Sequence, residues 1–321
     1  MSGFSLNGRN GESLLKNQKV LLLLALAMIA VVVTAINPNF VEVRNIISIF
    51  EQVSVLGILT VAMALLLISG GIDLSIGSIM ALAGVVISRI ITSGGSVWLA
   101  VLAGLLSATL CGLVNGLIIT LTKTMPLIIT LGMAGVYFGI ALMVSGGQFM
   151  NFSGAFDGIG RTRIAGVLPT TIIFVIVVVL LAFVLLNYTR FGRRIVAIGG
   201  NEENAYLSGI RVNRYKIAVY TIGGLLSGIA SIVLVARLDS IVATAGTGYE
   251  LSALTAAVVG GVTFEGGRGT IGGAFIGVVL IGVIANAMTI LSVNSYLQTA
   301  STGAIIVVAV IMSNLQNLRR A

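Results

Sequence analysis

The chain contains no histidine, a single cysteine and few charged residues, which make up 9% of its 321 residues. Without histidine it lacks the commonest general base and the commonest metal ligand. Cys111 alone forms neither an internal disulfide nor a thiolate cluster, and its place in an apolar run favours a packing role. The sequence therefore offers no catalytic residue, predicts no metal site and no cofactor, and argues against proteolysis by a Ser/His pair.

Nucleotide-binding motifs are also missing. No GxxxxGK[ST] phosphate loop occurs in the sequence, so the chain does not bind and hydrolyse ATP in the P-loop manner. Residues 267–272 match GxGxxG, but they connect two apolar segments and lack the strand–turn–helix context of that motif, so we interpret them as a tight turn. The net charge of +8 would suggest nucleic acid in a soluble protein. In a membrane protein it reports orientation instead, and we expect no nucleic-acid partner.

Apolar residues are in excess, at 57% of the chain. Soluble domains contain about 45–50% apolar and about 25% charged residues, so this chain has too few charges to cover a globule, and its apolar surface faces membrane lipid. A helix crosses the hydrocarbon core with about 20 apolar residues. The sequence predicts an all-α polytopic membrane helix bundle, one transmembrane domain over 1–321. The candidate spans are 20–36, 46–70, 74–92, 96–121, 126–145, 167–187, 215–236, 250–264, 270–290 and 298–314.

The first apolar run, 20–36, follows Lys16 and Lys19 and resembles the core of a signal peptide. No small-x-small cleavage site follows it, and further spans do. We interpret it as a retained first helix.

The distribution of basic residues predicts the orientation. About ten spans place both termini on one side. If that side is the cytoplasm, with 1–19 as a cytoplasmic tail, thirteen of the 18 Lys and Arg residues lie inside. The other five are Arg44, Arg89, Arg161, Arg163 and Arg237. Cytoplasmic loops collect Lys and Arg, so the charges favour a multi-pass membrane protein with both termini cytoplasmic.

Glycine is abundant, with 41 residues, and much of it recurs at four-residue spacing inside the predicted spans. Small residues at i and i+4 share one helix face and let two backbones approach closely. The pattern therefore predicts tight helix packing. The stripes are Gly104, Ala108, Gly112 and Gly116; Gly269, Gly273 and Gly277; and Gly224 with Gly228.

A weak internal repeat is visible. Asp73-Leu74-Ser75 opens the third span and Glu250-Leu251-Ser252 opens the eighth, while Asn115 lies in the fourth span and Asn286 in the ninth. The offset is five spans in each case. Because an odd offset gives the two copies opposite topology, we expect an inverted repeat of two halves, as in many transporters.

The longest hydrophilic segment after the first span is 187–216, a basic stretch with a short helix predicted at its centre. Asn201 is a suitable N-cap, Glu202 and Glu203 suit the positive end of the helix dipole, and Gly209 is a suitable end. One interpretation is a solvated cytoplasmic loop; the other is a docking helix for a soluble partner. The size of the loop and its capped centre favour docking.

Several polar residues lie within or between apolar spans. Asp73 with Ser75 is either a cap at the membrane surface or part of a gate, because an intramembrane carboxylate is costly unless paired or hydrated. Glu250 has the equivalent place in a segment expected on the outer side. Asn115, Asn286 and Gln298 either connect helices by hydrogen bonds or line a path for a polar solute.

Together these motifs resemble the permeases of the ribose, xylose, galactoside and allose group of bacterial ABC importers. The matching segments are INPNF at 36–40, SGGIDLSIGSIMALAG at 69–84, ITLG at 129–132, RFGRRIVAIGGNEENAYLSGI at 190–210, TAGTGYEL at 244–251 and VVGGVTFEGGRGTIGG at 258–273. The resemblance runs from about residue 20 to the end. Many members carry Arg-Gly where this chain has Phe138-Gly139, and Phe where it has Leu127, so the resemblance does not identify the sugar.

The resemblance implies a permease that works with a second permease copy (the same chain or a close homologue), with cytoplasmic ATP-binding-cassette ATPase subunits and with a periplasmic sugar-binding protein. It implies import of a monosaccharide, a pentose or hexose. It also implies that 187–216 is a cytoplasmic coupling loop. The implied ATPase-coupling residues are Asn201, Glu202, Glu203, Ala205, Leu207, Ser208 and Gly209.

Two other classes of function remain as alternatives. An ion-coupled secondary transporter of a small polar solute would also use an inverted repeat, and it usually carries an ionisable residue at mid-membrane depth. The acidic candidates here are Glu51, Asp73 and Glu250, two of which lie near span ends. A non-transporting scaffold would not need the large 187–216 loop.

Overall fold

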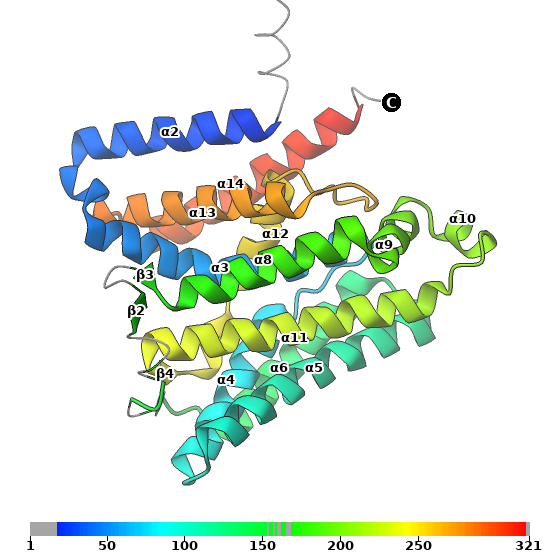
Figure 1. Cartoon of the computed structure of the whole chain (residues 1–321), viewed down its shortest axis with the longest axis horizontal. Helices are drawn as coiled ribbons and strands as arrows, with labels where there is room; N and C mark the ends of the chain where they lie inside the picture. Colours follow the sequence, from blue (N-terminus) through cyan, green and yellow to red (C-terminus); the bar gives the residue numbers. More distant parts are fainter. Residues whose placement is uncertain (1–17, 153, 157, 159–161, 165–167, 319–321) are drawn as a thin grey trace, which may run out of the picture.

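The computed structural model describes residues 18–152, 154–156, 158, 162–164 and 168–318. The predicted cytoplasmic tail, except for its last two residues, lies outside the described residues. The described chain is a bundle of α-helices with two 3-10 turns and four two-residue strands (Figure 1).

The helices are α2 (Gln18–Ile36), α3 (Val43–Ile68), α4 (Ile76–Thr92), α5 (Val97–Thr122), α6 (Pro126–Ser145), α8 (Thr171–Tyr188), α9 (Arg190–Gly200), α10 (Glu202–Leu207), α11 (Val212–Leu238), α12 (Tyr249–Val259), α13 (Ile271–Ile290) and α14 (Ser295–Leu318). The 3-10 turns are η1 (Pro38–Val41) and η2 (Ala243–Gly246). The strands β1 (Met150–Asn151) and β4 (Ser240–Ile241) pair antiparallel, as do β2 (Arg163–Ile164) and β3 (Leu168–Pro169).

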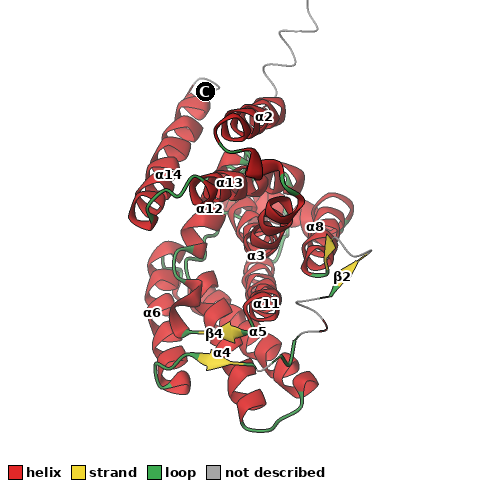
Figure 2. Ribbon diagram, turned by 90° about the vertical axis from the view of Figure 1, so that its left-hand side faces the viewer, coloured by secondary structure: helices red, strands yellow, loops and turns green. Residues whose placement is uncertain are grey.

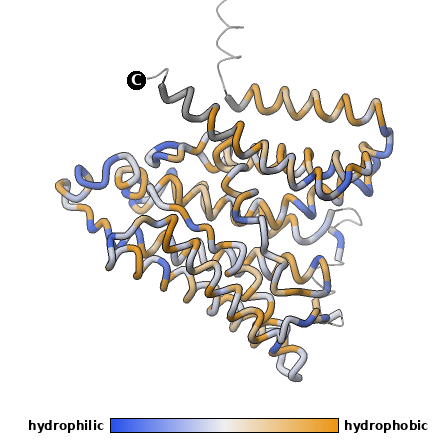
Figure 3. The backbone as a smooth tube through the Cα atoms, turned by 180° about the vertical axis from the view of Figure 1, so that it is seen from behind, coloured by the Kyte–Doolittle hydropathy of each residue, from blue (hydrophilic) through white to orange (hydrophobic). Residues whose placement is uncertain are grey.

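The prediction of an all-α membrane bundle is confirmed. A helix lies at each of the ten predicted spans, and among the described residues six helices are long and apolar enough to cross a membrane: α3, α5, α6, α8, α11 and α13. Figure 3 shows hydrophobic residues along the helices and hydrophilic residues gathered at the ends of the bundle. Helix α12 has only 11 residues, about 16 Å at 1.5 Å per residue, which is about half the hydrocarbon thickness.

Helix ends follow from local sequence. The hydroxyl oxygen of Ser96 accepts a hydrogen bond from Leu99 N and caps α5, and Thr270 caps α13 by accepting from Gly273 N. Pro126 begins α6, where its missing N–H costs nothing. Gly146, at φ +62°, ends the same helix.

Helix α3 is the centre of the bundle. Every residue from Val53 to Ser69 is buried, because α8, α11, α12 and α13 pack around it, as Figure 2 shows. A helix that is apolar on all sides is either enclosed by protein, as α3 is, or faces lipid. The outer helices α5, α6 and α8 instead expose much of their apolar surface, as lipid-facing helices do.

Glycine stripes form close helix contacts, as predicted. A Cβ atom on Gly112 of α5 would lie 2.3 Å from the carbonyl oxygen of Tyr220 in α11, and one on Gly224 of α11 would lie 2.3 Å from that of Ala108. In α13, a Cβ on Gly277 would lie 2.1 Å from the carbonyl oxygen of Ala256. These helix pairs therefore touch backbone to backbone.

Two adjacent glycines of α13 test this packing. A Cβ on Gly273 would lie 2.2 Å from the carbonyl oxygen of Gly260, whereas one on Gly272 would meet nothing within 4 Å. We expect Gly273→Ala to lower the stability of the detergent-solubilised protein by about 1–3 kcal/mol. Gly272→Ala should be neutral or stabilising, since Ala favours a helix over Gly by about 0.5–1 kcal/mol. Fluorescence-detected size-exclusion after heating measures both, and equal melting temperatures for the two variants would contradict the packing.

Candidate functional site

The helical path of α3 does not continue into α4 but stops at an unwound segment, 69–75, which we call the first link. Gly70 adopts φ +76°, a conformation that glycine permits without strain. The backbone N–H of Gly71 donates to the carbonyl of Leu66 at 2.9 Å and closes the end of α3. The link is not at the surface: Ile72, Asp73 and Ser75 are buried.

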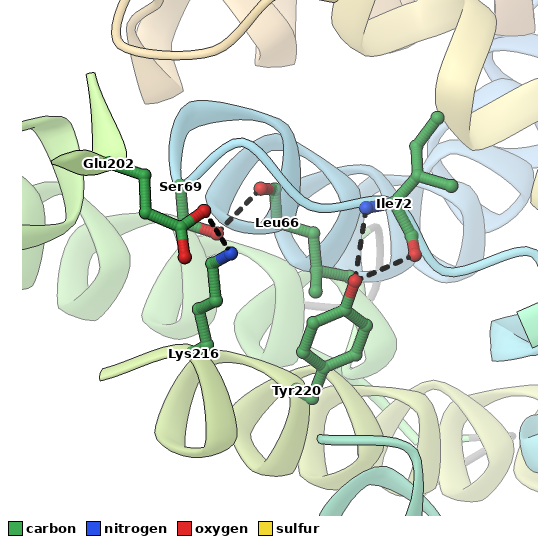
Figure 4. Close-up of polar contacts among 6 residues, drawn as sticks. All are labelled: Leu66, Ser69, Ile72, Glu202, Lys216 and Tyr220. Carbon is green, nitrogen blue, oxygen red and sulfur yellow. Dashed lines mark hydrogen bonds and ion pairs between the residues drawn. The ribbon is translucent and has the colours of Figure 1, made fainter. Parts of the chain in front are cut away.

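Side chains from two other helices bind the polar backbone of the first link. The hydroxyl of Tyr220, in α11, accepts a hydrogen bond from Ile72 N at 3.2 Å and donates to Ile72 O at 3.0 Å (Figure 4). The hydroxyl oxygen of Thr130, in α6, accepts from Leu74 N at 3.1 Å. Unwound backbone inside a bilayer needs such partners, because water is absent there.

Asp73 is the centre of a buried polar network. Its Oδ1 accepts hydrogen bonds from the Ser75 backbone N at 2.8 Å and from the Ser75 hydroxyl at 2.5 Å. The Asn115 side-chain amide of α5 donates to Asp73 Oδ2 at 3.1 Å and to the Ser75 hydroxyl oxygen at 2.8 Å. All three side chains have a relative exposure of 0%. Among the described residues, no Lys or Arg forms an ion pair with Asp73.

The network continues to α6. The hydroxyl of Tyr137 lies 2.8 Å from Asn115 Oδ1 and 2.9 Å from the carbonyl oxygen of Cys111, and it donates to one of them at a time. The first link, α5 and α6 are thus joined by a continuous chain of hydrogen bonds. Asp73 and its partners Ser75 and Asn115 are fully enclosed by protein. Asn115 connects helices.

A second interruption of the helical path, 239–248, contains β4 and η2 and separates α11 from α12, and we call it the second link. Gly248 adopts φ +86°, and its N–H donates to Glu250 Oε1 at 3.1 Å. Glu250 is half-buried. The second link touches the first turn of α4: a Cβ on Gly77 would lie 2.3 Å from Gly246 O and 2.5 Å from Glu250 Oε2. The sequence placed these two acidic segments in separate halves, and the structure brings them into contact.

Asn286 has a different partner from Asn115. Its side chain exchanges two hydrogen bonds of 2.9 Å with Asn45 of α3, so it joins α13 to α3 instead of a link. The two asparagines that the sequence paired by position are therefore in different surroundings. Gln298 donates to Val293 O at 2.9 Å and stabilises the turn between α13 and α14.

The 187–216 segment contains the end of α8, the helices α9 and α10 and the first turn of α11, and α9 was not predicted from the sequence. Asn201 caps α10 as predicted, since its Oδ1 accepts from Asn204 N at 2.8 Å, and Gly209 follows it at φ +80°. Glu202 forms an ion pair with Lys216 of α11 (Figure 4). Ala205 is buried with Ile198 and Val212 in a small apolar cluster.

The outer face of α10 is exposed and lies at one end of the bundle (Figure 1). Its apolar side chains Tyr206 and Leu207 are 68% and 75% exposed. Glu203 and Ser208 are exposed beside them. Exposed apolar side chains on a short, well-anchored helix are typical of a docking surface.

Glycines connect the base of α9 to the first link. A Cβ on Gly199 would lie 1.9 Å from Ile68 O, and Gly70 packs against Gly199. From the connection between α12 and α13, Gly267 N donates to Ile68 O at 2.9 Å. Four segments therefore meet at these glycines, which we call the glycine junction. Through this junction, only α9 separates α10 from the first link, which carries Asp73.

The sequence did not predict the roles of Tyr220, Tyr137 and Thr130. Each lies in an apolar helix and bonds to a residue or helix far away in sequence, so no local pattern indicates its partner. The described residues contain no group of three His, Cys, Asp or Glu side chains that could hold a metal ion.

Comparisons with known proteins give a consistent result. Residues 45–311 match the family model described as "Branched-chain amino acid transport system / permease component". The chain is 39% identical over 298 residues to the ribose import permease protein of Bacillus subtilis, covering 92% of each chain. It is 35% identical to the D-allose transport system permease protein of Escherichia coli, covering 90% of each. It is also 35% identical to the L-arabinose ABC transporter permease protein of Azospirillum brasilense, covering 98% of this chain and 92% of that one. No solved structure matches.

The Asp73 network can be tested by exchanging its donor and acceptor. Asn115→Leu leaves Asp73 Oδ2 without its donor in a buried place, so we expect a loss of stability of about 1–3 kcal/mol. The double variant Asp73→Asn with Asn115→Asp again places a side-chain amide opposite a carboxylate. It should therefore lose less stability than Asn115→Leu. Thermal unfolding in detergent compares them; a double variant that is less stable than Asn115→Leu would contradict the network.

Proposed function

The chain belongs to the bacterial ABC-importer permease family that includes the ribose, allose and arabinose permeases, and from this premise we propose that it forms the membrane pathway of a monosaccharide importer. The observation that carries the proposal is identity of 35–39% over 90% or more of the chain to permeases whose names specify ribose, allose and arabinose. The family model mentions branched-chain amino acids. The sugar permeases match at nearly full length, so we favour a pentose or hexose.

In this role the chain is a transport subunit of the inner membrane and not an enzyme. ATP is hydrolysed by separate ATPase subunits on the cytoplasmic side, and a periplasmic binding protein delivers the sugar. The pathway is surrounded by membrane lipid. The whole chain, 1–321, acts as one permease domain.

We propose ten membrane passages with both termini in the cytoplasm. In support, α2 begins and α14 ends at the same end of the bundle as α9 and α10 (Figure 1), where the basic 190–216 segment lies. Helix α12 completes its passage with the unwound segments on either side of it.

An inverted repeat of α3–α6 and α11–α14 is part of the same proposal. The helix lengths run 26, 17, 26 and 20 residues in the first half and 27, 11, 20 and 24 in the second. In both halves the short helix comes second and follows a link associated with an acidic residue. Discontinuous helices in corresponding places of two halves are the usual location of a transport pathway.

The proposed ATPase-docking element is α10 with its flanks, 201–209. Its exposed Glu203, Tyr206 and Leu207 face away from the bundle, while Ala205 anchors it. A displacement of α10 by the ATPase would move α9, and the glycine junction would pass that movement to the first link. We therefore propose that Asp73 and Ser75 act at the gate of an alternating-access cycle.

The other pathway candidates have different proposed roles. Glu250 lies where the second link meets α4 and belongs to the same gate. Asn115 and Asn286 already bind protein partners, so we propose that they hold helices in position and do not bind sugar.

A second permease copy, either this chain or a close homologue, is proposed to pack against α6 and α14. Gly132, Gly135 and Gly139 of α6 share one helix face, and a Cβ on any of them would meet nothing within 4 Å. Gly303 of α14 is equally open. The two helices lie on the same side of the bundle (Figure 2). Close helix packing in membranes uses such small-residue faces, and the sugar would pass between the two copies.

A secondary transporter is the alternative function, favoured by the buried carboxylate of Asp73. Proteoliposomes distinguish the two. With the ATPase and the binding protein, we expect sugar uptake that requires ATP. Gly209→Val strains a left-handed residue beside α10 and should reduce uptake at least about tenfold. Gly200→Val, which has open space and no left-handed backbone, is the control. Uptake by the chain alone, driven by an ion gradient, would exclude the importer.

The α6 face is tested by cross-linking. In a Cys111→Ala background, which is free of cysteine, Gly135→Cys should form a disulfide-linked dimer in oxidised membranes. Val177→Cys, on the lipid-facing side of α8, should not. If membranes that contain only this permease give no dimer through Gly135→Cys, the pairing of two identical chains at α6 is excluded.

A further inference from the structure

A pocket of about 510 Å³ lies between α9 and the start of α11, at the end of the bundle that carries α10. Its walls carry three arginines, Arg194, Arg211 and Arg214, and two aromatic rings, Phe191 and Tyr215, with Ala218 on the side of α11. Its volume falls in the range of about 300–1,000 Å³ that is usual for small-ligand sites. Of its lining residues only Gly209 belongs to a function proposed above, as the last residue of the ATPase-docking element.

The arginines of the pocket have unused charge. Among the described residues, no carboxylate forms an ion pair with any of the three. The acidic side chain of the adjacent helix, Glu202, is already paired with Lys216. Arg211 and Arg214 are exposed, so their guanidinium groups are accessible to an anion. Guanidinium groups bind phosphate oxygens in pairs of parallel hydrogen bonds.

The third arginine is held in place. Arg194 donates a hydrogen bond to the hydroxyl of Tyr215, and its guanidinium carbon lies 5.4 Å from the centre of that ring. The Phe191 ring is 5.5 Å from the Tyr215 ring. The pocket thus combines a fixed cation, two accessible cations and an apolar wall.

The pocket lies at the level where the lipid-facing helices end. Helix α8, which exposes apolar side chains to lipid, ends at Tyr188, and α9 begins two residues later. Tyr188 is 70% exposed, as is usual for an aromatic residue at the membrane interface. Basic pockets between helices at this level bind the headgroups of anionic lipids.

We propose that this pocket binds the phosphate of an anionic phospholipid headgroup. The three arginines bind the phosphate, and the wall of Phe191, Tyr215 and Ala218 contacts the glycerol and the first acyl carbons. Free phosphate matches only the arginines and leaves the apolar wall uncovered. Because Gly209 also borders the pocket, a bound lipid would lie directly beside the proposed docking element. The proposal does not depend on the transported solute or on the ATPase.

The test is native mass spectrometry of the purified full-length chain with phosphatidylglycerol or phosphatidylcholine of identical acyl chains. We expect preferential binding of phosphatidylglycerol, and a decrease of its affinity of at least about tenfold in Arg211→Gln/Arg214→Gln, since glutamine cannot form the paired, charge-assisted hydrogen bonds of a guanidinium group to phosphate. The control is Arg190→Gln/Arg193→Gln, which removes the same charge from α9 outside the pocket and should retain affinity within about twofold.

Three outcomes would overturn the proposal. They are equal binding of the two lipids, an equal decrease in both double variants, and full displacement of the lipid by millimolar inorganic phosphate, which would make the site one for a free anion. If Arg211→Gln/Arg214→Gln keeps phosphatidylglycerol but no longer retains the ATPase in a pull-down, the pocket is a protein-docking site and the lipid proposal is wrong.

Discussion

Backbone polar groups inside a bilayer must find protein partners, and the rest of this structure depends on that constraint. Helices are interrupted at the first and second links, and inside a bilayer the free N–H and C=O groups of such segments cannot bind water. In the first link, the Tyr220 and Thr130 hydroxyls take the place of water for Ile72 and Leu74. The Asp73 carboxylate binds the N–H of Ser75 and is itself bound by Asn115. The positions of α5, α6 and α11 follow from these bonds, because each helix must bring its side chain to the link.

Glycine provides the second condition for this arrangement. An unwound segment is reached by short side chains only if the helices around it are close. The α5–α11 contact is backbone to backbone, which brings Asn115 and Tyr220 within reach of the same seven-residue link. The close packing at small residues therefore allows the polar groups of the first link to find hydrogen-bond partners.

The sequence predicted the helices other than α9, the glycine stripes and the cap of α10, because each depends on residues a few positions apart. Hydropathy defines the spans, and four-residue spacing defines the packing faces. The cap of α10 depends on Asn201 and on the residue three positions later. The site could be predicted only in part. Asp73 and Asn115 were identified as polar residues among apolar ones, but their contact, and the contact of Gly77 with Gly246, depends on the folding of distant segments. Nothing in the sequence indicates that Tyr220 binds the first link, since an aromatic residue in an apolar helix usually only packs against its apolar neighbours.

The glycine junction has a mechanical consequence. Packed helices normally move against each other in steps, because ridges of side chains must leave one set of grooves and enter the next. At Gly70, Gly199 and Gly267 the surfaces in contact are peptide backbones without side chains. Such surfaces have no ridges, and no rotamer has to change when they shift. We therefore expect α9 to slide over the first link by continuous small displacements, with most of the energy barrier of the transport cycle located elsewhere in the bundle.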